Sequence, residues 1–286
     1  MLANMDGIRS LIEKTAIANP YTIRSLSGEL SRLARKGGGV GLLFLLLYSC
    51  VYLETPKKTV PIQKVPAPMS AGTKRLVIVL PGRGDDLSDL QQSGIASTIQ
   101  KQLSDADVWL IELTFPYYME GRAPQRVHEQ IVQPAKRAGY REIYLAGASM
   151  GGMGVLLYER EYPDQASGLI LMAPYMGDEE LIEEITAAGG LAKWQAGPKP
   201  KKIDSDNVGR EEWRLIQSWK ADNQRTRQVW LICGKSDRFH GAVKFIAPLL
   251  PPGHTVEPDG GHAWSVWTKG AEKVFSQINA RRPETL

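Results

Sequence analysis

Ser149 stands in the one glycine-rich motif of this chain that suits nucleophilic chemistry. The stretch Gly147-Ala148-Ser149-Met150-Gly151 follows an apolar run (142–147) and precedes a stretch with helical character. This is G-x-S-x-G at a strand-to-helix turn, where the serine takes a strained conformation that exposes its hydroxyl. Small residues two positions away let the strand and the helix approach closely. The spacing is neither G-x-G-x-x-G nor G-x-x-x-x-G-K-[ST], which excludes a phosphate-binding loop.

A serine hydroxyl is a poor nucleophile at neutral pH, so it needs a base beside it and a third group that holds the base. His262 lies in the loop PDGGHAW after the last apolar run, and Asp237 directly follows the run 228–234. Both residues therefore leave predicted strands at the same edge as Ser149, in the order serine, aspartate, histidine. We expect His262 to be the base and Asp237 to orient it.

The remaining histidines and one further aspartate compete for these roles. His128 lies within a predicted helix among charged residues and is expected to be solvated. His240, three residues past Asp237, is expected to pack or to face water, and His254 begins a predicted strand too early in the chain to be the base. Asp259 precedes His262 by only three residues, which makes it a weaker choice than Asp237 to orient the imidazole.

Acyl transfer also requires two donors for the negative charge that develops on the substrate oxygen. The N–H of Met150, directly after the serine, is the first by position. The loop VLPGRGDD leaves the apolar run 75–80, and the N–H of Arg83 is the expected second donor, although the Arg83 side chain could instead line the site. Arg83-Gly84-Asp85 also spells an adhesion tripeptide, which we set aside because we expect a buried turn at the active site.

Strands and helices alternate from residue 74 onward. Apolar runs dense in Val, Ile and Leu predict strands at 75–80, 107–115, 142–147, 167–174, 228–234 and, more weakly, 254–258. Helical stretches lie between them at 87–103, 124–139 and 153–163. The alternation predicts the α/β class with a doubly wound, mostly parallel sheet. Residues 178–227 interrupt it, and we expect them to form a small cap insertion over the carboxyl edge, where such sheets bind their ligands.

Length, composition, net charge and cysteine count limit the class of protein. The chain has 286 residues, of which 43% are hydrophobic and 23% charged, as in a globular protein with a sizeable core. Its formal net charge of +4 does not indicate nucleic-acid binding. The two cysteines, Cys50 and Cys233, exclude a disulfide framework.

Residues 1–73 differ in composition from the rest. We divide the chain into an N-terminal extension (1–36), a signal-peptide-like or anchor segment (37–53), a proline-rich linker (54–73) and a folded domain (74–286). Basic residues precede a short apolar run that ends at Leu47-Tyr48-Ser49-Cys50, which resembles a bacterial lipobox with lipidation at Cys50. An uncleaved anchor helix is the alternative. Either way, we expect a membrane-associated protein of the cell envelope.

Residues from roughly 74 to 284 resemble the α/β-hydrolase superfamily. The stretch GASMGGMGVLLYEREYPD resembles its S-formylglutathione hydrolase and carboxylesterase branch, which typically shows a Ser-Met-Gly-Gly elbow, whereas Pro81 stands where relatives carry a histidine. The resemblance implies a serine hydrolase that cleaves small-molecule esters through an acyl-enzyme at Ser149, Asp237 and His262, without metal or organic cofactor. A lipase, thioesterase or peptidase is the alternative, as is a non-catalytic binding protein that kept the fold. The oligomeric state stays open.

Overall fold

The computed structural model describes residues 56–69 and 75–281. The chain divides into two units, Met1–Thr55 and Pro56–Leu286, and all elements below belong to the second. Cys50 and the predicted segments 1–36 and 37–53 lie outside the described residues.

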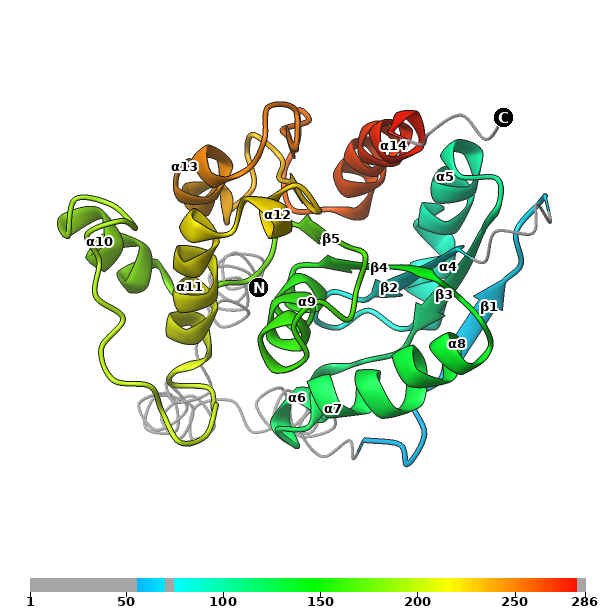
Figure 1. The fold of residues 1–286 in the computed structure, drawn as a ribbon, viewed down its shortest axis with the longest axis horizontal. Helices are drawn as coiled ribbons and strands as arrows, with labels where there is room; N and C mark the ends of the chain where they lie inside the picture. Colours follow the sequence, from blue (N-terminus) through cyan, green and yellow to red (C-terminus); the bar gives the residue numbers. More distant parts are fainter. Residues whose placement is uncertain (1–55, 70–74, 282–286) are drawn as a thin grey trace, which may run out of the picture. The chain divides into compact units, whose positions relative to one another are not determined.

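A seven-stranded sheet forms the centre of the domain, in the strand order β1-β3-β2-β4-β5-β6-β7 (Figure 1). The strands are β1 (Ile62–Val65), β2 (Arg75–Leu80), β3 (Ala106–Ile111), β4 (Glu142–Ala148), β5 (Gly168–Met172), β6 (Val229–Ile232) and β7 (Thr255–Val256). β1 runs antiparallel to β3, and all the other pairs are parallel. The prediction of a mostly parallel α/β sheet is therefore confirmed.

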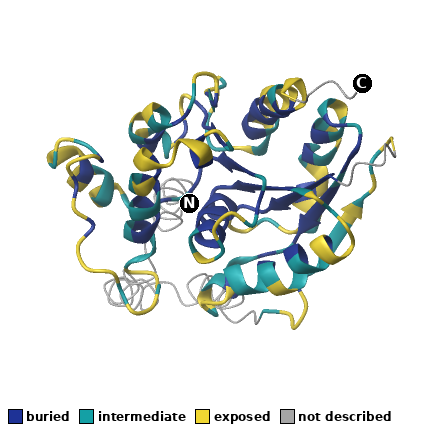
Figure 2. Cartoon of the chain, viewed as in Figure 1, coloured by how far each residue is buried: buried dark blue, intermediate teal, exposed yellow. Residues whose placement is uncertain are grey.

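The strands are buried because helices cover both faces of the sheet. Every residue of β2, β5 and β6 is buried, as their unbroken apolar runs predict (Figure 2). Helices α5 (Ile95–Gln102) and α14 (Trp264–Ala280) pack together on one face (Figure 1). Helix α9 (Met150–Glu161) packs on β4 and β5 and against α7 (Ala123–Val127) on the other. The fold is doubly wound, as expected.

Two stretches predicted as single helices are interrupted. Residues 87–103 form α4 (Leu87–Gln92) and α5, because Gly94 between them takes a positive φ of 71°. Residues 124–139 form α7, a π-helical turn η3 (His128–Val132) and α8 (Gln133–Arg137). Pro134 explains the second interruption, since it has no N–H to continue the α-helical hydrogen bonds.

Residues 62–65, which we expected within an extended linker, form the edge strand β1. Val60 is buried, and Ile62 and Val65 pack against the core. The prolines that suggested a linker are compatible with this arrangement, because an edge strand does not need every N–H for pairing. The sheet therefore begins before the boundary at residue 74 that we inferred from the sequence.

The segment between β5 and β6 contains the helices α10 (Glu179–Ala187), α11 (Val208–Ser218), η4 (Trp219–Ala221) and α12 (Asn223–Thr226). Helix α11 packs closely on the loop that follows β5. A Cβ on Gly209 would lie 2.6 Å from the Cα of Gly177, and Trp213 Nε1 donates to the Met176 carbonyl at 3.0 Å. These contacts hold α11 at the carboxyl end of β5. We call residues 178–227 the cap.

The remaining helices of the domain are short. Helix α6 (Phe115–Met119) follows β3, and η5 (His240–Ala242), α13 (Val243–Ile246) and η6 (Ala247–Leu249) lie between β6 and β7.

Candidate active site

Ser149 lies between β4 and α9 with φ 52° and ψ −115°. A positive φ at a residue other than glycine costs about 1–3 kcal/mol, which the packing around it must offset. A Cβ on Gly147 would lie 2.2 Å from the Gly151 carbonyl oxygen, and one on Gly151 would lie 2.5 Å from the Leu80 carbonyl oxygen. Hydrogen alone fits at both positions. The glycines of the motif are thus required by the close approach of helix and strands.

Asp237 and His262 follow β6 and β7, and the structure brings them together. His262 Nδ1 lies 2.9 Å from each carboxylate oxygen of Asp237. The Asp237 side chain is fully buried and also accepts a hydrogen bond from the N–H of Phe239 at 2.9 Å. Because an ionised carboxylate only accepts, Nδ1 carries the proton, and Nε2 is left as the basic nitrogen. This is the tautomer that a general base needs.

Aromatic rings fix the plane of the imidazole. Phe239 and Trp267 each meet the ring of His262 nearly at right angles, with ring centres 5.0 and 4.7 Å away. Together with Asp237 they leave the ring little freedom. In the described structure His262 bonds to Asp237 and makes no direct hydrogen bond to Ser149. Catalytic hydrogen bonds of this kind are often formed only when substrate binds.

Asp85 joins two of the loops at this edge and was not singled out from the sequence. Its Oδ2 accepts from the N–H of Gly82 at 3.0 Å and from Trp264 Nε1 at 2.8 Å. Gly82 lies against the nucleophile, since a Cβ there would be 3.7 Å from Ser149 Cβ. Asp85 thereby holds the loop after β2 to the start of α14, two residues beyond His262. The sequence held one signal for Asp85, the RGDD string, in which acidic residues stand next to the predicted oxyanion loop.

The two expected oxyanion donors both lie near Ser149. Met150 is the first residue of α9, where an N–H has no acceptor within the helix. Arg83 follows Gly82, but it is exposed rather than buried as we expected. Asp85 N–H donates to the Gly82 carbonyl at 3.3 Å, and Gly84 has φ 88°, so Arg83 and Gly84 form the tip of a tight turn. The Arg83 guanidinium lies over the ring of Phe115 at 5.0 Å.

The competing residues have other partners. His240 pairs with Glu257, His254 with the Val229 carbonyl, and Asp259 with Lys235. Asp259 is 84% exposed, which leaves Asp237 as the acid at the imidazole. The expectation that His128 is solvated was wrong. It is half-buried, stacks on Tyr162 at 3.8 Å and shares a hydrogen bond with the Tyr158 hydroxyl at 3.1 Å.

A small apolar cluster beside the nucleophile is separate from the main core. Its buried members are Met150, Met153 and Leu157 of α9, and its half-buried members are Phe115, Tyr118, Tyr175, Ile203 and Val208. We call it the Met150 cluster. The N–H of Tyr175 donates to the Ser149 carbonyl at 3.0 Å, and the Tyr175 ring meets that of Phe239, the neighbour of His262. The cluster therefore runs from the candidate active site into the cap.

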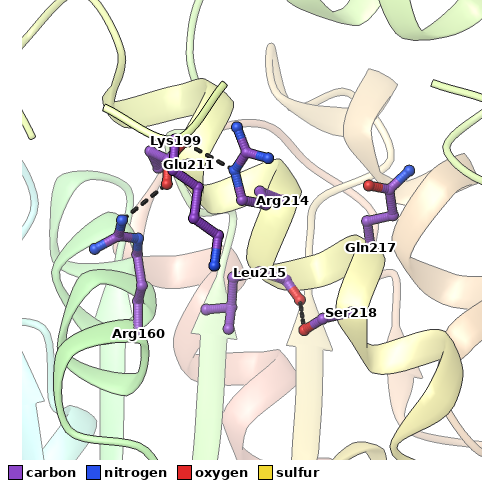
Figure 3. A pocket seen from close by; sticks show the side chains of 7 residues that line it. All are labelled: Arg160, Lys199, Glu211, Arg214, Leu215, Gln217 and Ser218. Carbon is purple, nitrogen blue, oxygen red and sulfur yellow. Dashed lines mark hydrogen bonds and ion pairs between the residues drawn. The ribbon is translucent and has the colours of Figure 1, made fainter. Parts of the chain in front are cut away.

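A cavity of about 550 Å³ lies elsewhere, between the end of α9 and the cap (Figure 3). It is lined by Arg160, Lys199, Glu211, Arg214, Leu215, Gln217 and Ser218. The buried Glu211 carboxylate accepts from Arg160 at 2.8 Å and from Arg214 at 2.9 Å. Burial alone would raise the pKa of Glu211, but these two hydrogen bonds outweigh it and lower the pKa. The pair with Arg160 ties α11 to α9, and no member of the candidate triad lines this cavity.

Residues 56–69 and 75–281 form neither a metal-binding cluster nor a membrane-spanning helix. No group of three or more His, Cys, Asp and Glu side chains there is arranged to hold a metal ion. Nor does any helix of that part have the length and apolarity to cross a membrane. Cys233 is buried and free just after β6.

Comparisons with known protein sequences find hydrolases that are similar to part of this chain. The family model described as serine aminopeptidase, S33, matches residues 125–237, which is less than half of the chain. The 2-hydroxy-6-oxononadienedioate/2-hydroxy-6-oxononatrienedioate hydrolase of Comamonas testosteroni is 25% identical in a match that covers 45% of this chain. The chain spans only 59% of the length of that relative.

Solved structures agree with this fold at low identity. S-formylglutathione hydrolase from Staphylococcus aureus matches with TM-score 0.52 and 11% identity over 79% of this chain and 99% of its own. Est1E from Butyrivibrio proteoclasticus gives 0.51 and 16% over 77% and 92%. The monoacylglycerol lipase of Paleococcus ferrophilus gives 0.50 and 12% over 78% and 99%. With the sheet order and the strained serine turn, these matches show that the chain has the α/β-hydrolase fold.

Proposed function

We propose that this protein is a serine hydrolase that cleaves carboxylic esters of small molecules. The observation that carries the proposal is the contact of the part-buried His262 with the buried Asp237, at the same carboxyl edge of the sheet as the strained Ser149 turn. A hydroxyl, a buried carboxylate and an imidazole in this chain order are the parts of an acyl-transfer triad.

In the proposed reaction, Ser149 Oγ attacks the ester carbonyl while His262 Nε2 accepts its proton. Asp237 stabilises the imidazolium that forms, and the N–H groups of Met150 and Arg83 bind the oxyanion. His262 then returns the proton to the leaving alcohol, which yields an acyl-enzyme on Ser149. A water molecule, activated by the same imidazole, hydrolyses the acyl-enzyme and restores the serine.

The Met150 cluster supports small esters with an apolar part. Its methionine and aromatic side chains begin one residue after the nucleophile, where the acyl or alcohol group of a bound ester would lie. Several proteins of similar fold are named as esterases or lipases, which adds to the expectation. A lipase, thioesterase or peptidase could use the same triad. The matching family model is described as a serine aminopeptidase, which supports peptidase activity as an alternative. A fold alone proves no activity, so a binding protein is the outcome to exclude.

Covalent labelling with a fluorophosphonate probe tests the nucleophile. We expect the wild-type protein to be labelled and Ser149→Ala to be unlabelled. p-Nitrophenyl esters from acetyl to palmitoyl, a thioester series and aminoacyl p-nitroanilides then identify the bond. Faster hydrolysis of the anilides than of every ester would favour the peptidase. Absence of labelling in the wild type would favour the binding protein.

We also propose that the protein is held at the membrane of the cell envelope, through a lipid on Cys50 or through segment 37–53 as an uncleaved anchor. A single acyl chain binds a bilayer only marginally, so stable attachment needs more than one. Mass spectrometry of the mature N-terminus from a bacterial host separates the two forms, with Cys50→Ser as the matched variant. A full-length chain found free of membranes would contradict both.

A further inference from the structure

Glu212 on the cap helix α11 is a buried acid without a hydrogen-bond partner among residues 56–69 and 75–281. The residue is 1% exposed, and neither of its carboxylate oxygens has a hydrogen-bond partner. The hydroxyl of Tyr118, after β3, is likewise buried and without a partner. Buried polar groups are hydrogen-bonded in the great majority of cases, and each exception calls for an explanation.

Both groups belong to the surroundings of the nucleophile. Tyr118 is a member of the Met150 cluster, and its hydroxyl lies against α9, since a Cβ on Gly154 would be 2.2 Å from it. Gly154 is four residues after Met150 and therefore on the same face of the helix. Glu212 is near enough for its charge to raise the pKa of Tyr118, after the larger effect of burial. The unpartnered groups thus lie on the side of α9 that begins at Ser149.

Tyr175 links Glu212 to the active site from the other direction. Burial and then the hydrogen bond to Asp178 raise the pKa of Tyr175, and the charge of Glu212 adds to this effect. The main chain of Tyr175 bonds to Ser149, and its ring contacts Phe239 beside His262. Glu212 stands four residues after Val208, a member of the Met150 cluster, and therefore lies on the face of α11 that packs on this cluster with the two phenols.

The neighbouring acid shows what a structural role looks like in the same helix. Glu211 is equally buried, and Arg160 and Arg214 neutralise it. For Glu212, burial raises the pKa well above the usual range. A buried carboxyl without a cation favours the neutral acid, which has one donor and one acceptor to offer.

We propose that the Glu212 carboxyl and the Tyr118 hydroxyl bind a hydroxyl group carried by the apolar part of the ester substrate. A substrate hydroxyl donates one hydrogen bond and accepts another, which matches a carboxylic acid next to a phenol. The remaining members of the Met150 cluster would contact the apolar body of that substrate. The substrate class is thus an ester with an apolar acyl or alcohol part that bears a hydroxyl. This inference rests on the proposed function of Ser149.

A substrate ammonium group fits the site less well. It would require Glu212 to ionise at a position from which water is excluded, and the phenol beside it supplies no second negative charge. Charge burial of this kind is stabilised only by close pairing and further hydrogen bonds. The amine is therefore the alternative that the experiment must exclude.

The experiment compares matched methyl esters on the wild-type enzyme. Methyl octanoate, its hydroxylated analogues with the hydroxyl moved along the chain, and the corresponding amino analogues are assayed for kcat/KM. We expect one hydroxylated ester to exceed the plain ester by about 10- to 100-fold, because two orphaned groups gain partners only with that substrate. Equal kcat/KM for all hydroxylated and plain esters, or a preference for an amino ester, would overturn the proposal.

Two variants assign the preference to these groups. The ratio of kcat/KM for the preferred hydroxylated ester to that for the plain ester should approach one in Tyr118→Phe and in Glu212→Leu, mainly through KM. The matched control is Tyr117→Phe, because Tyr117 is the neighbouring buried phenol of α6 but belongs to the main core and not to the Met150 cluster. This control should keep the wild-type ratio. An unchanged ratio in both test variants would contradict the inference.

Binding without turnover gives a second readout if a variant folds poorly. In Ser149→Ala, the infrared band of the protonated Glu212 carboxyl, identified by its loss in Glu212→Gln, should shift when the hydroxylated ester binds and not when the plain ester binds. If this band does not shift when the hydroxylated ester binds, Glu212 does not contact the substrate hydroxyl. Failure of the proposed function would look different: no fluorophosphonate labelling and no hydrolysis of any ester.

Discussion

The sheet edge and the cap both bury acidic residues, but they use them differently. At the sheet edge, the buried Asp237 carboxylate accepts from His262 and from the main chain of Phe239. In the cap, two consecutive acids of α11 are equally buried, and only Glu211 has arginine partners. Burial alone therefore says little about what an acid does. The three acids differ in their partners: Asp237 contacts an imidazole, Glu211 ties two helices together through arginines, and Glu212 has no hydrogen-bond partner among the described residues.

The difference also concerns stability. Partnered carboxylates such as Asp237 and Glu211 have hydrogen bonds that replace those to water, whereas an unpartnered one loses that solvation without compensation. We expect the paired acids to stabilise the fold or the geometry of the site, and Glu212 to destabilise the fold. The following predictions test this contrast, beginning with the largest effect.

Removing the nucleophile or the base should cause the largest loss. Ser149→Ala and His262→Ala should each lower kcat by about 10⁶-fold, and the double variant should lose little more, because the two act as one unit. Steady-state kinetics on the best p-nitrophenyl ester measure this. Additive losses in the double variant would mean that the two residues act independently.

Asp237→Asn should lower kcat by about 10⁴-fold, because an amide in place of the carboxylate disfavours the reactive imidazole tautomer. The matched control is Asp259→Asn, at an exposed aspartate paired only with Lys235, which should leave kcat unchanged. If Asp259→Asn lowered kcat strongly and Asp237→Asn did not, Asp259 would be the acid that orients the imidazole.

Glu211→Gln should lower the free energy of unfolding by about 2–3 kcal/mol at pH 7, since it leaves two arginines without their carboxylate. The folded-state pKa of Glu211 is lowered, so its contribution is present above the unfolded pKa of about 4.3 and is lost as pH falls through the folded value. Urea titrations from pH 3 to 7 should show the difference between variant and wild type vanish at low pH. Glu184→Gln, at a more exposed pair with Arg210, should cost at most about 1 kcal/mol.

Glu212→Gln should have the opposite sign, a gain of more than about 1 kcal/mol in the free energy of unfolding at pH 7, because each unit of pKa shift is worth about 1.4 kcal/mol. The folded-state pKa of Glu212 is raised, so the folded protein keeps a proton that the unfolded chain loses above pH of about 4.3. The wild type therefore loses stability as pH rises from that value, and the variant does not. The same urea titrations should show both proteins equal at pH 3. A loss of stability at pH 7 would mean that Glu212 has a stabilising partner.

Much of the fold and of the candidate site could be predicted because the signals are local. Unbroken apolar runs indicated the strands β2 to β6, and the G-x-S-x-G motif at a strand end indicated the Ser149 turn. Asp237 and His262 were chosen because parallel strands end at one edge, and the structure brings these two residues into contact. Their catalytic roles and that of Ser149 stay predictions. The edge strand β1 was missed because prolines around it outweighed a short apolar pattern.

The sequence by itself determined what depends on neighbouring residues: strands from apolar runs, and a serine turn from glycines that close packing requires. Tertiary structure decided the rest, because partners distant in the chain leave no local pattern. Asp85 bonds to Trp264 across 179 positions. Glu211 and Glu212 are identical neighbours, yet successive residues of a helix point about 100° apart. That rotation turns one acid toward Arg160 and Arg214 and leaves the other on the face of α11 that packs on the Met150 cluster, without a hydrogen-bond partner among the described residues.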